Sequence, residues 1–334
     1  MVSLPVTGSW PRLHLPGILV ASIAVAFALV VSRFVPAVSP AIIAVTAGAT
    51  LANLGWLSDR LRPGLTFVSK KVLRAAIVLL GLQIAVPQVL SLGRQTLLIV
   101  VVATGVTFAV TPLIGRRLGL PEGASLLIAT GVSICGAAAI AAMNETGGSD
   151  DDDVAGALSV VTLYGTAAIV IIPLLASWLG LSGQQLGVWT GASVHEVAQV
   201  AAIGAASGAA VLTVAVTVKL ARVVLLAPLV AITSFRKRSG RPITATAKRP
   251  PILPLFVVGF LVMVAVRSLG LVPEAVTGAV PIVTNLLLAA ALFGLGTGID
   301  VRKLMKGGKT LLLGAVATLL VGGISLAGVA LLVP

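Results

Sequence analysis

Long apolar runs recur along the whole chain and are separated by short polar connections. Each run has about twenty residues, which is the length that a helix needs to cross the hydrocarbon core of a bilayer. The pattern therefore predicts an all-α polytopic membrane protein. We expect about eleven transmembrane helices, at 15–35, 40–57, 66–88, 95–114, 122–143, 154–179, 185–206, 209–234, 252–270, 276–299 and 310–333.

The composition agrees with a chain that lies almost entirely in the membrane. Hydrophobic residues make up 58% of the 334 residues and charged residues 10%, whereas about 25% of a soluble domain is charged. This leaves no room for a sizeable soluble domain, so we expect a single transmembrane domain over 1–334. The first apolar run is long enough to span the membrane, and we interpret it as a retained helix.

An excess of positive charge lies mainly between the apolar runs. The net charge is +13, from 23 Lys and Arg against 10 Asp and Glu. Basic loops stay on the cytoplasmic side of membranes, which explains this excess without a nucleic-acid partner. The rule predicts a multi-pass membrane protein with a cytoplasmic N-terminus and an external C-terminus. The basic loop 235–251 would then meet anionic lipid in the cytoplasm, and Asp150–Asp153 would lie outside.

The apolar runs also suggest an internal repeat. The sequence Lys71-Val-Leu-Arg74 in the third run resembles Lys219-Leu-Ala-Arg222 in the eighth, and a Gly-rich stretch follows each one two runs later, at 131–136 and 294–298. We therefore predict an extra helix at 15–35 and two five-helix repeats, 40–179 and 185–333. Five is odd, so the repeats would be inverted. Inverted repeats with Gly-interrupted helices are typical of secondary transporters.

One stretch, GASVHEVAQV at 191–200, places His195 and Glu196 in an apolar run. A zinc-protease helix would need a second His four residues after the first, and Gln199 occupies that position. With one nearby imidazole and a single Cys in the chain, we predict neither a metal site nor an enzyme, and no cofactor. An ionisable pair inside a membrane helix indicates a functional site, although a hydrogen-bonded clasp between helices is the alternative.

Two basic residues, Lys219 and Arg222, lie far from both ends of their apolar run and share one helix face. We expect them to bind an anion, with Glu196 as counter-ion and His195 titrating to couple transport to protons. Lys71 and Arg74 either join this site or flank the cytoplasmic interface. Basic residues outnumber the carboxylates of this candidate core, whereas a cation site would show the opposite imbalance.

The Gly-rich interruptions supply further candidate ligands, because a half-helix N-terminus has free N–H groups and the positive end of a helix dipole. Glycines that only allow close helix packing are the alternative at each position. The polar candidates in the other runs could equally be helix–helix hydrogen bonds. The additional substrate-binding candidates are Ser133, Cys135, Gly136, Gly296, Thr297, Asn285 and Asn53.

Four stretches resemble the bacterial YeiH-type membrane proteins, a family named after proposed sulfate export: GASVHEVAQV (191–200), VKLARVVLLAP (218–228), SICGAAAI (133–140) and GLGTGIDVRKL (294–304). The resemblance covers nearly the whole chain and implies a location in the bacterial inner (plasma) membrane. It extends to the group that includes bile-acid, arsenite and riboflavin transporters, and it implies two inverted five-helix repeats whose fourth helices are broken and cross near the bilayer midplane. The sequence departs from the family's pattern at Ala138, where a small hydroxyl residue is expected.

Together these features predict a secondary active transporter of a small anion that works by alternating access. The resemblance implies sulfate, another sulfur oxyanion or an organosulfonate, and export. A proton or sodium ion would be the coupling ion, and a homo-oligomer is left open. The alternatives are a cation–proton exchanger of similar architecture, an uncoupled anion channel, and an intramembrane enzyme that uses His195 and Glu196.

Overall fold

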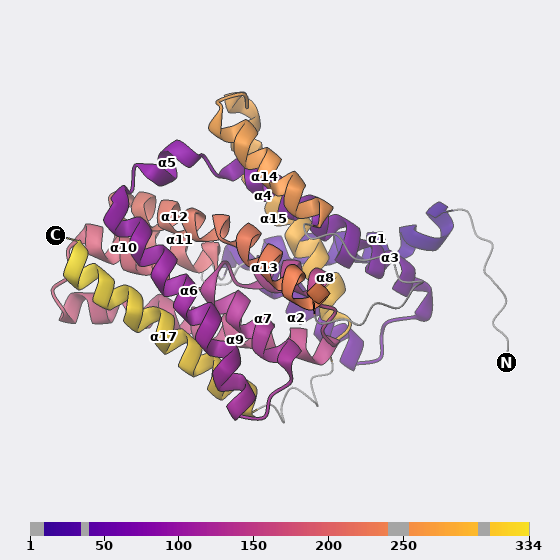
Figure 1. Cartoon of the computed structure of the whole chain (residues 1–334). Helices are drawn as coiled ribbons and strands as arrows, with labels where there is room; N and C mark the ends of the chain where they lie inside the picture. The colour runs from indigo at the N-terminus through magenta and orange to yellow at the C-terminus, as the bar shows by residue number, and fades with distance from the viewer. Residues whose placement is uncertain (1–9, 35–39, 240–253, 300–307, 334) are drawn as a thin grey trace.

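The computed structural model describes residues 10–34, 40–239, 254–299 and 308–333, and within these ranges all regular structure is helical. Six segments of the described residues are long and apolar enough to cross a membrane. They are α1 (Trp10–Phe34), α6 (Gly93–Arg117), α9 (Asp151–Trp178), α12 with α13 (Ala209–Val224 and Leu226–Ser239), α15 (Glu274–Gly296) and α17 (Gly308–Leu332). This confirms a multi-pass, all-helical membrane protein (Figure 1).

The remaining helices are shorter. One run from the third apolar stretch contains α3 (Arg62–Phe67), the π-helix η2 (Val68–Val72), α4 (Leu73–Leu80) and the 3₁₀ turn η3 (Gly81–Gln83). The others are α2 (Pro40–Asn53), η1 (Asp59–Leu61), α5 (Val86–Leu90), α7 (Glu122–Ser133), α8 (Ala137–Gly147), α10 (Gly183–Ser193), α11 (Val197–Ser207) and α14 (Leu255–Ser268).

Contacts between helix termini define two ends of the molecule. At one end, which we call the Asp151 end, Gly298 packs against Asp151 and Gly119 lies near Lys309. At the other, the Val333 end, the Gln185 side chain donates to the Val333 carbonyl over 2.8 Å. The long helices α9 and α17 connect these two ends, so the direction of every other helix can be read against them.

Two of the predicted spans do not cross. Gly123, in the first turn of α7, packs against Ser149 and Asp153, which follow α8. The α7–α8 segment therefore enters and leaves at the Asp151 end. The α10–α11 segment does the same at the Val333 end, because Gly183 packs against Val211 in the first turn of α12. The 12 residues of α7 reach about 18 Å at 1.5 Å per residue, roughly half of a ~30 Å bilayer core. The prediction of spanning helices at 122–143 and 185–206 is wrong, and both are re-entrant hairpins.

The hairpins also change the expected position of the acidic run. Because α7–α8 returns the chain to its starting end, Asp150–Asp153 lies at the same end as Arg117 and Lys309, not at the opposite one. Two fewer crossings leave the number odd, so the start of α1 and the end of α17 still lie at opposite ends. Gly17 packs near Leu61 at the Asp151 end, whereas Val333 marks the other end.

The helices form two packed groups; in Figure 1, α1 and α3 of one group lie to the right, and α6, α10 and α17 of the other lie to the left. The panel group contains α1, α2, the α3–η3 run, α14 and α15. One of its close contacts is between α2 and α15, where Gly48 and Gly296 each meet the partner helix backbone. The hairpin group contains α6 to α13 and α17, with α17 packed against α6, α7, α9 and α10.

These groups cut across the predicted repeats 40–179 and 185–333, and the two five-helix repeats are not confirmed. What recurs with opposite orientation is a hairpin followed by a long helix: α7–α8–α9 from the Asp151 end and α10–α11–α12 from the Val333 end. The Gly-rich stretch 294–298 lies at the C-terminal end of α15 and does not interrupt that helix. Gly294 allows close packing on η2, and Gly296 allows close packing on α2.

Candidate functional site

The tips of the two hairpins meet inside the protein. One tip is 134–136, between α7 and α8, and the other is 194–196, between α10 and α11. The Ala137 N–H donates to Glu196 Oε1 across the two tips, over 3.4 Å. Gly136 has a φ of +72°, and a Cβ added there would lie 2.5 Å from Glu196 Cγ, so glycine is required both by the backbone and by the opposite tip.

Lys219 on α12 joins the tips through its ammonium group. Its side chain is fully buried. Nζ donates to the Ile134 carbonyl over 2.6 Å and to the Val194 carbonyl over 2.5 Å, one from each hairpin. One charged side chain is thus hydrogen-bonded to both hairpin tips.

Arg222, one turn further along α12 and also fully buried, makes a parallel set of bonds. Nε donates to Ser133 O over 3.0 Å and Nη2 to Val132 O over 2.6 Å, both at the end of α7. Nη1 donates to Val194 O over 2.9 Å and to Gly191 O over 3.4 Å, at the end of α10.

The acceptors of these bonds have a common origin. The last carbonyls of a helix lack intrahelical partners and form the negative end of its dipole. Lys219 and Arg222 therefore stabilise the C-terminal ends of α7 and α10, and those carbonyls offset part of the large cost of burying two cations. The sequence had left a hydrogen-bonded clasp as the alternative for His195 and Glu196, and it did not predict these bonds of Lys219 and Arg222.

Glu196 serves the opposite ends of the interrupted helices. It is the N-cap of α11, where its side chain accepts from the backbone N–H of Gln199 and its own N–H donates to Gln199 Oε1 over 3.0 Å. With the bond from Ala137, its carboxylate lies at the N-termini of α8 and α11. Glu196 was expected to pair with Lys219 and Arg222; in the structure the hydrogen bonds of those two side chains go to backbone carbonyls instead.

His195 and Gln199 attach the second tip to long helices. His195 is 1% exposed, and its Nε2 lies 3.0 Å from the hydroxyl of Thr318 on α17. Gln199 donates to the Val161 carbonyl of α9 over 3.4 Å and packs against Gly165. Thr318 is a site residue that sequence reasoning missed, because nothing distinguishes it from the other Thr residues of apolar helices.

Eight of the predicted residues come together at these tips. Ser133 bonds to the Ala129 carbonyl of its own helix, and Cys135 is buried in the first tip. Within the described ranges no three His, Cys, Asp or Glu side chains could share a metal ion. The residues gathered at the tips are Ser133, Cys135, Gly136, His195, Glu196, Gln199, Lys219 and Arg222.

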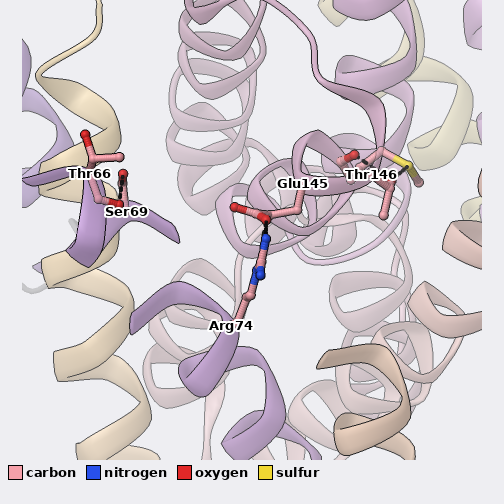
Figure 2. Close-up of polar contacts among 6 residues, drawn as sticks. Thr66, Ser69, Arg74, Glu145 and Thr146 are labelled. Atoms are coloured by element: carbon pink, nitrogen blue, oxygen red, sulfur yellow. Dashed lines mark hydrogen bonds and ion pairs between the residues drawn. The ribbon is translucent and has the colours of Figure 1, made fainter. Parts of the chain in front are cut away.

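The other predicted residues lie elsewhere. Arg74 forms an ion pair with Glu145 of α8 (Figure 2), and Lys71 is exposed in η2. Asn53 donates to the Ala49 and Ile299 carbonyls over 2.7 and 2.6 Å, where it joins α2 to the residues that follow α15.

Three of these residues lie on or next to α15. Gly296 packs against α2, Thr297 bonds to the Gly294 carbonyl over 2.7 Å, and Asn285 is exposed. The structure therefore does not bring them to the hairpin tips. The helix-packing alternative explains Gly296.

Comparison with known proteins places the chain in one family of membrane proteins. A family model described as conserved hypothetical protein 698 matches residues 16–315. A UPF0324 membrane protein of Corynebacterium glutamicum is 44% identical over 317 residues, which cover 94% of this chain and 92% of that protein. One from Agrobacterium fabrum is 32% identical over 326 residues, covering 95% and 92% of the two chains. The chain therefore belongs to the UPF0324 family of membrane proteins, which is the YeiH-type family that its hairpin-tip sequences resemble.

Proposed function

We propose that this protein is a secondary transporter that carries a small anion across the bacterial inner membrane. The observation that carries the proposal is the charge at the hairpin tips. Lys219 and Arg222 are both buried there, against the single carboxylate of Glu196. With a neutral imidazole at His195 the tips have an excess of one positive charge. An anion would compensate this charge, whereas a cation would add to it.

The basic side chains retain donors for such a solute. An ammonium group has three N–H donors and Lys219 uses two, while a guanidinium group has five and Arg222 uses four. An oxyanion with several acceptor oxygens suits these donors, which supports sulfate, another sulfur oxyanion or an organosulfonate. The first turns of α8 and α11 lie beside them, and Ala138, Val197 and Ala198 are only partly buried there.

The hairpins provide a route for alternating access. They enter from opposite ends and meet at one place, so opening either hairpin would expose the same site to one side of the membrane. The positive-inside rule makes the end with Arg117 and Lys309 cytoplasmic, which supports a cytoplasmic N-terminus and an external C-terminus. Export is supported only by the resemblance to proteins named after sulfate export. His195 or Glu196 would carry a coupled proton, or a sodium ion would take that part. We propose a carrier and not an enzyme.

Solute counterflow tests this function. Proteoliposomes preloaded with sulfate, sulfite, thiosulfate or taurine should accumulate the matching labelled solute against its gradient. A channel would equilibrate the label without accumulation. If no anion is accumulated and a pH or sodium jump instead drives cation exchange, the anion proposal is wrong and the single carboxylate at Glu196 becomes the candidate ligand.

A further inference from the structure

An ion pair connects the panel group to the hairpin group. Arg74 lies on α4 of the panel group and Glu145 on α8 of the hairpin group. Arg74 Nε donates to Glu145 Oε2 over 2.9 Å, and Nη2 bonds to the same oxygen. Figure 2 shows the two side chains extended toward each other from separate helices.

Only one of the two side chains, that of Glu145, is largely buried. The Glu145 side chain is 10% exposed and that of Arg74 is 43% exposed. A carboxylate that is largely removed from water depends on its partner, so separating the pair requires Glu145 to gain water or a proton. The ion pair is therefore stable while Glu145 is shielded from water, and it can separate when a movement of the helices lets water reach Glu145. Such a contact suits two parts of a protein that move relative to each other.

The position of Glu145 links the pair to the hairpin tips. Glu145 lies near the C-terminal end of α8, and Ala137 at the other end donates to Glu196. Glu145 lies eight positions after Ala137, about 12 Å along one helix at 1.5 Å per residue. A displacement of α8 at the ion pair is therefore transmitted to the tip that contacts Glu196.

The panel side of the pair has an unusual backbone. Arg74 is the second residue after η2, and π-helical turns occur frequently at functional sites. The helices that pack on α8 are α7, α9 and α13 of its own group and α4 of the other. Arg74 is thus the charged contact that joins this hairpin arm to the panel group within the described residues.

We propose that the Arg74–Glu145 pair is a latch that holds the α7–α8 hairpin against the panel group and separates when that hairpin opens. The proposal rests on the transport function above. A purely structural ion pair would stay closed throughout the cycle, whereas a latch has to break in each turnover.

Reversible cross-linking tests whether the pair must separate. In the variant Arg74→Cys/Glu145→Cys, a short bifunctional thiosulfonate reagent would join α4 to α8. We expect counterflow to fall at least tenfold on cross-linking and to return when a reductant cleaves the link. Unchanged counterflow in fully cross-linked protein would overturn the latch.

A link inside one group is the matched control. A Cβ at residue 156 of α9 would lie 3.9 Å from Thr310 Cβ of α17, a distance suited to a disulfide. Gly156→Cys/Thr310→Cys should therefore transport equally well when oxidised and reduced. Wild-type protein treated with the reagent controls for the buried Cys135.

Hydrogen exchange tests the latch without a known substrate, so a failure of the anion proposal remains distinguishable. Arg74→Gln should raise backbone exchange along 137–147 about tenfold, with little change in α2 and α15. The swapped pair Arg74→Glu/Glu145→Arg should return exchange toward the wild-type rate. If Arg74→Gln leaves exchange in α8 unchanged, the pair holds nothing closed and the latch is wrong even where anion transport is observed.

Discussion

At the scale of single residues, the hairpin tips depend on buried cations that satisfy carbonyl groups. Replacing Lys219 with Met keeps most of the volume but leaves the Ile134 carbonyl without its Lys219 donor, while the Val194 carbonyl keeps the bond from Arg222 Nη1. An unsatisfied buried group costs about 1–3 kcal/mol, so we expect a loss of about 1–3 kcal/mol in unfolding free energy. Thermal unfolding in detergent measures it. Lys309→Met, at an exposed position, should change stability by less than about 0.5 kcal/mol, and an equal effect of both would contradict the assigned role.

Gly136 carries a second residue-scale prediction. Alanine at this position would have to adopt a φ of +72° and would collide with Glu196 Cγ. Backbone strain alone costs about 1–3 kcal/mol, and we expect Gly136→Ala to lower the free energy of unfolding by at least that amount. Gly105→Ala is the matched control, because Gly105 is exposed on α6 with no atom within 4 Å of an added Cβ. Similar unfolding temperatures for both variants would show that the tips are not in close contact.

The sequence allowed part of this site to be predicted. Ionisable residues in apolar runs are rare, so His195, Glu196, Lys219 and Arg222 were identifiable, and the structure brings them together. The groups they bind were not identifiable, because every residue has a carbonyl and only the fold decides which carbonyls are free. For the same reason Glu196 was interpreted as a counter-ion and not as a cap of two half-helices.

At the scale of elements, apolar runs predicted where helices lie but not whether they cross. The predicted 95–114, 154–179 and 310–333 correspond to α6, α9 and α17. The stretch 122–143 is equally apolar, yet it forms two helices of 12 and 11 residues joined by a tight turn. A hairpin buried among other helices and a spanning helix need the same side chains, so contacts such as Gly123 with Asp153 decide between them.

Membrane sidedness of single cysteines checks the two hairpins. Arg117→Cys and Asp150→Cys flank α7–α8 and are exposed, and both should react with an impermeant thiol reagent from the same side. Gln184→Cys and Ala206→Cys flank α10–α11 and should both react from the opposite side. Eleven crossing helices would instead place the members of each pair on different sides. The buried Cys135 of the wild type serves as the unlabelled background.

At the scale of the whole molecule, the two helix groups are the parts that alternating access would move. A transported anion must bind the two end states differently to shift their populations, and packed groups respond as near-rigid bodies. Spin labels at Leu271→Cys and Gln184→Cys lie in the panel and hairpin groups, and both positions are exposed near the Val333 end. We expect saturating anion to change the distance between these labels by about 2 Å or more.

The same measurement needs a pair that should not move. Arg94→Cys and Gln184→Cys both lie in the hairpin group, on α6 and α10, which are in contact. Their distance distribution should be the same with and without anion, measured by pulsed electron spin resonance. If both pairs stay fixed while counterflow proceeds, the groups do not move as bodies, and access must come from the hairpins alone. If the label distance changes in both pairs, the boundary between the two groups is not where we place it. The Arg74–Glu145 contact would then not lie between two moving groups.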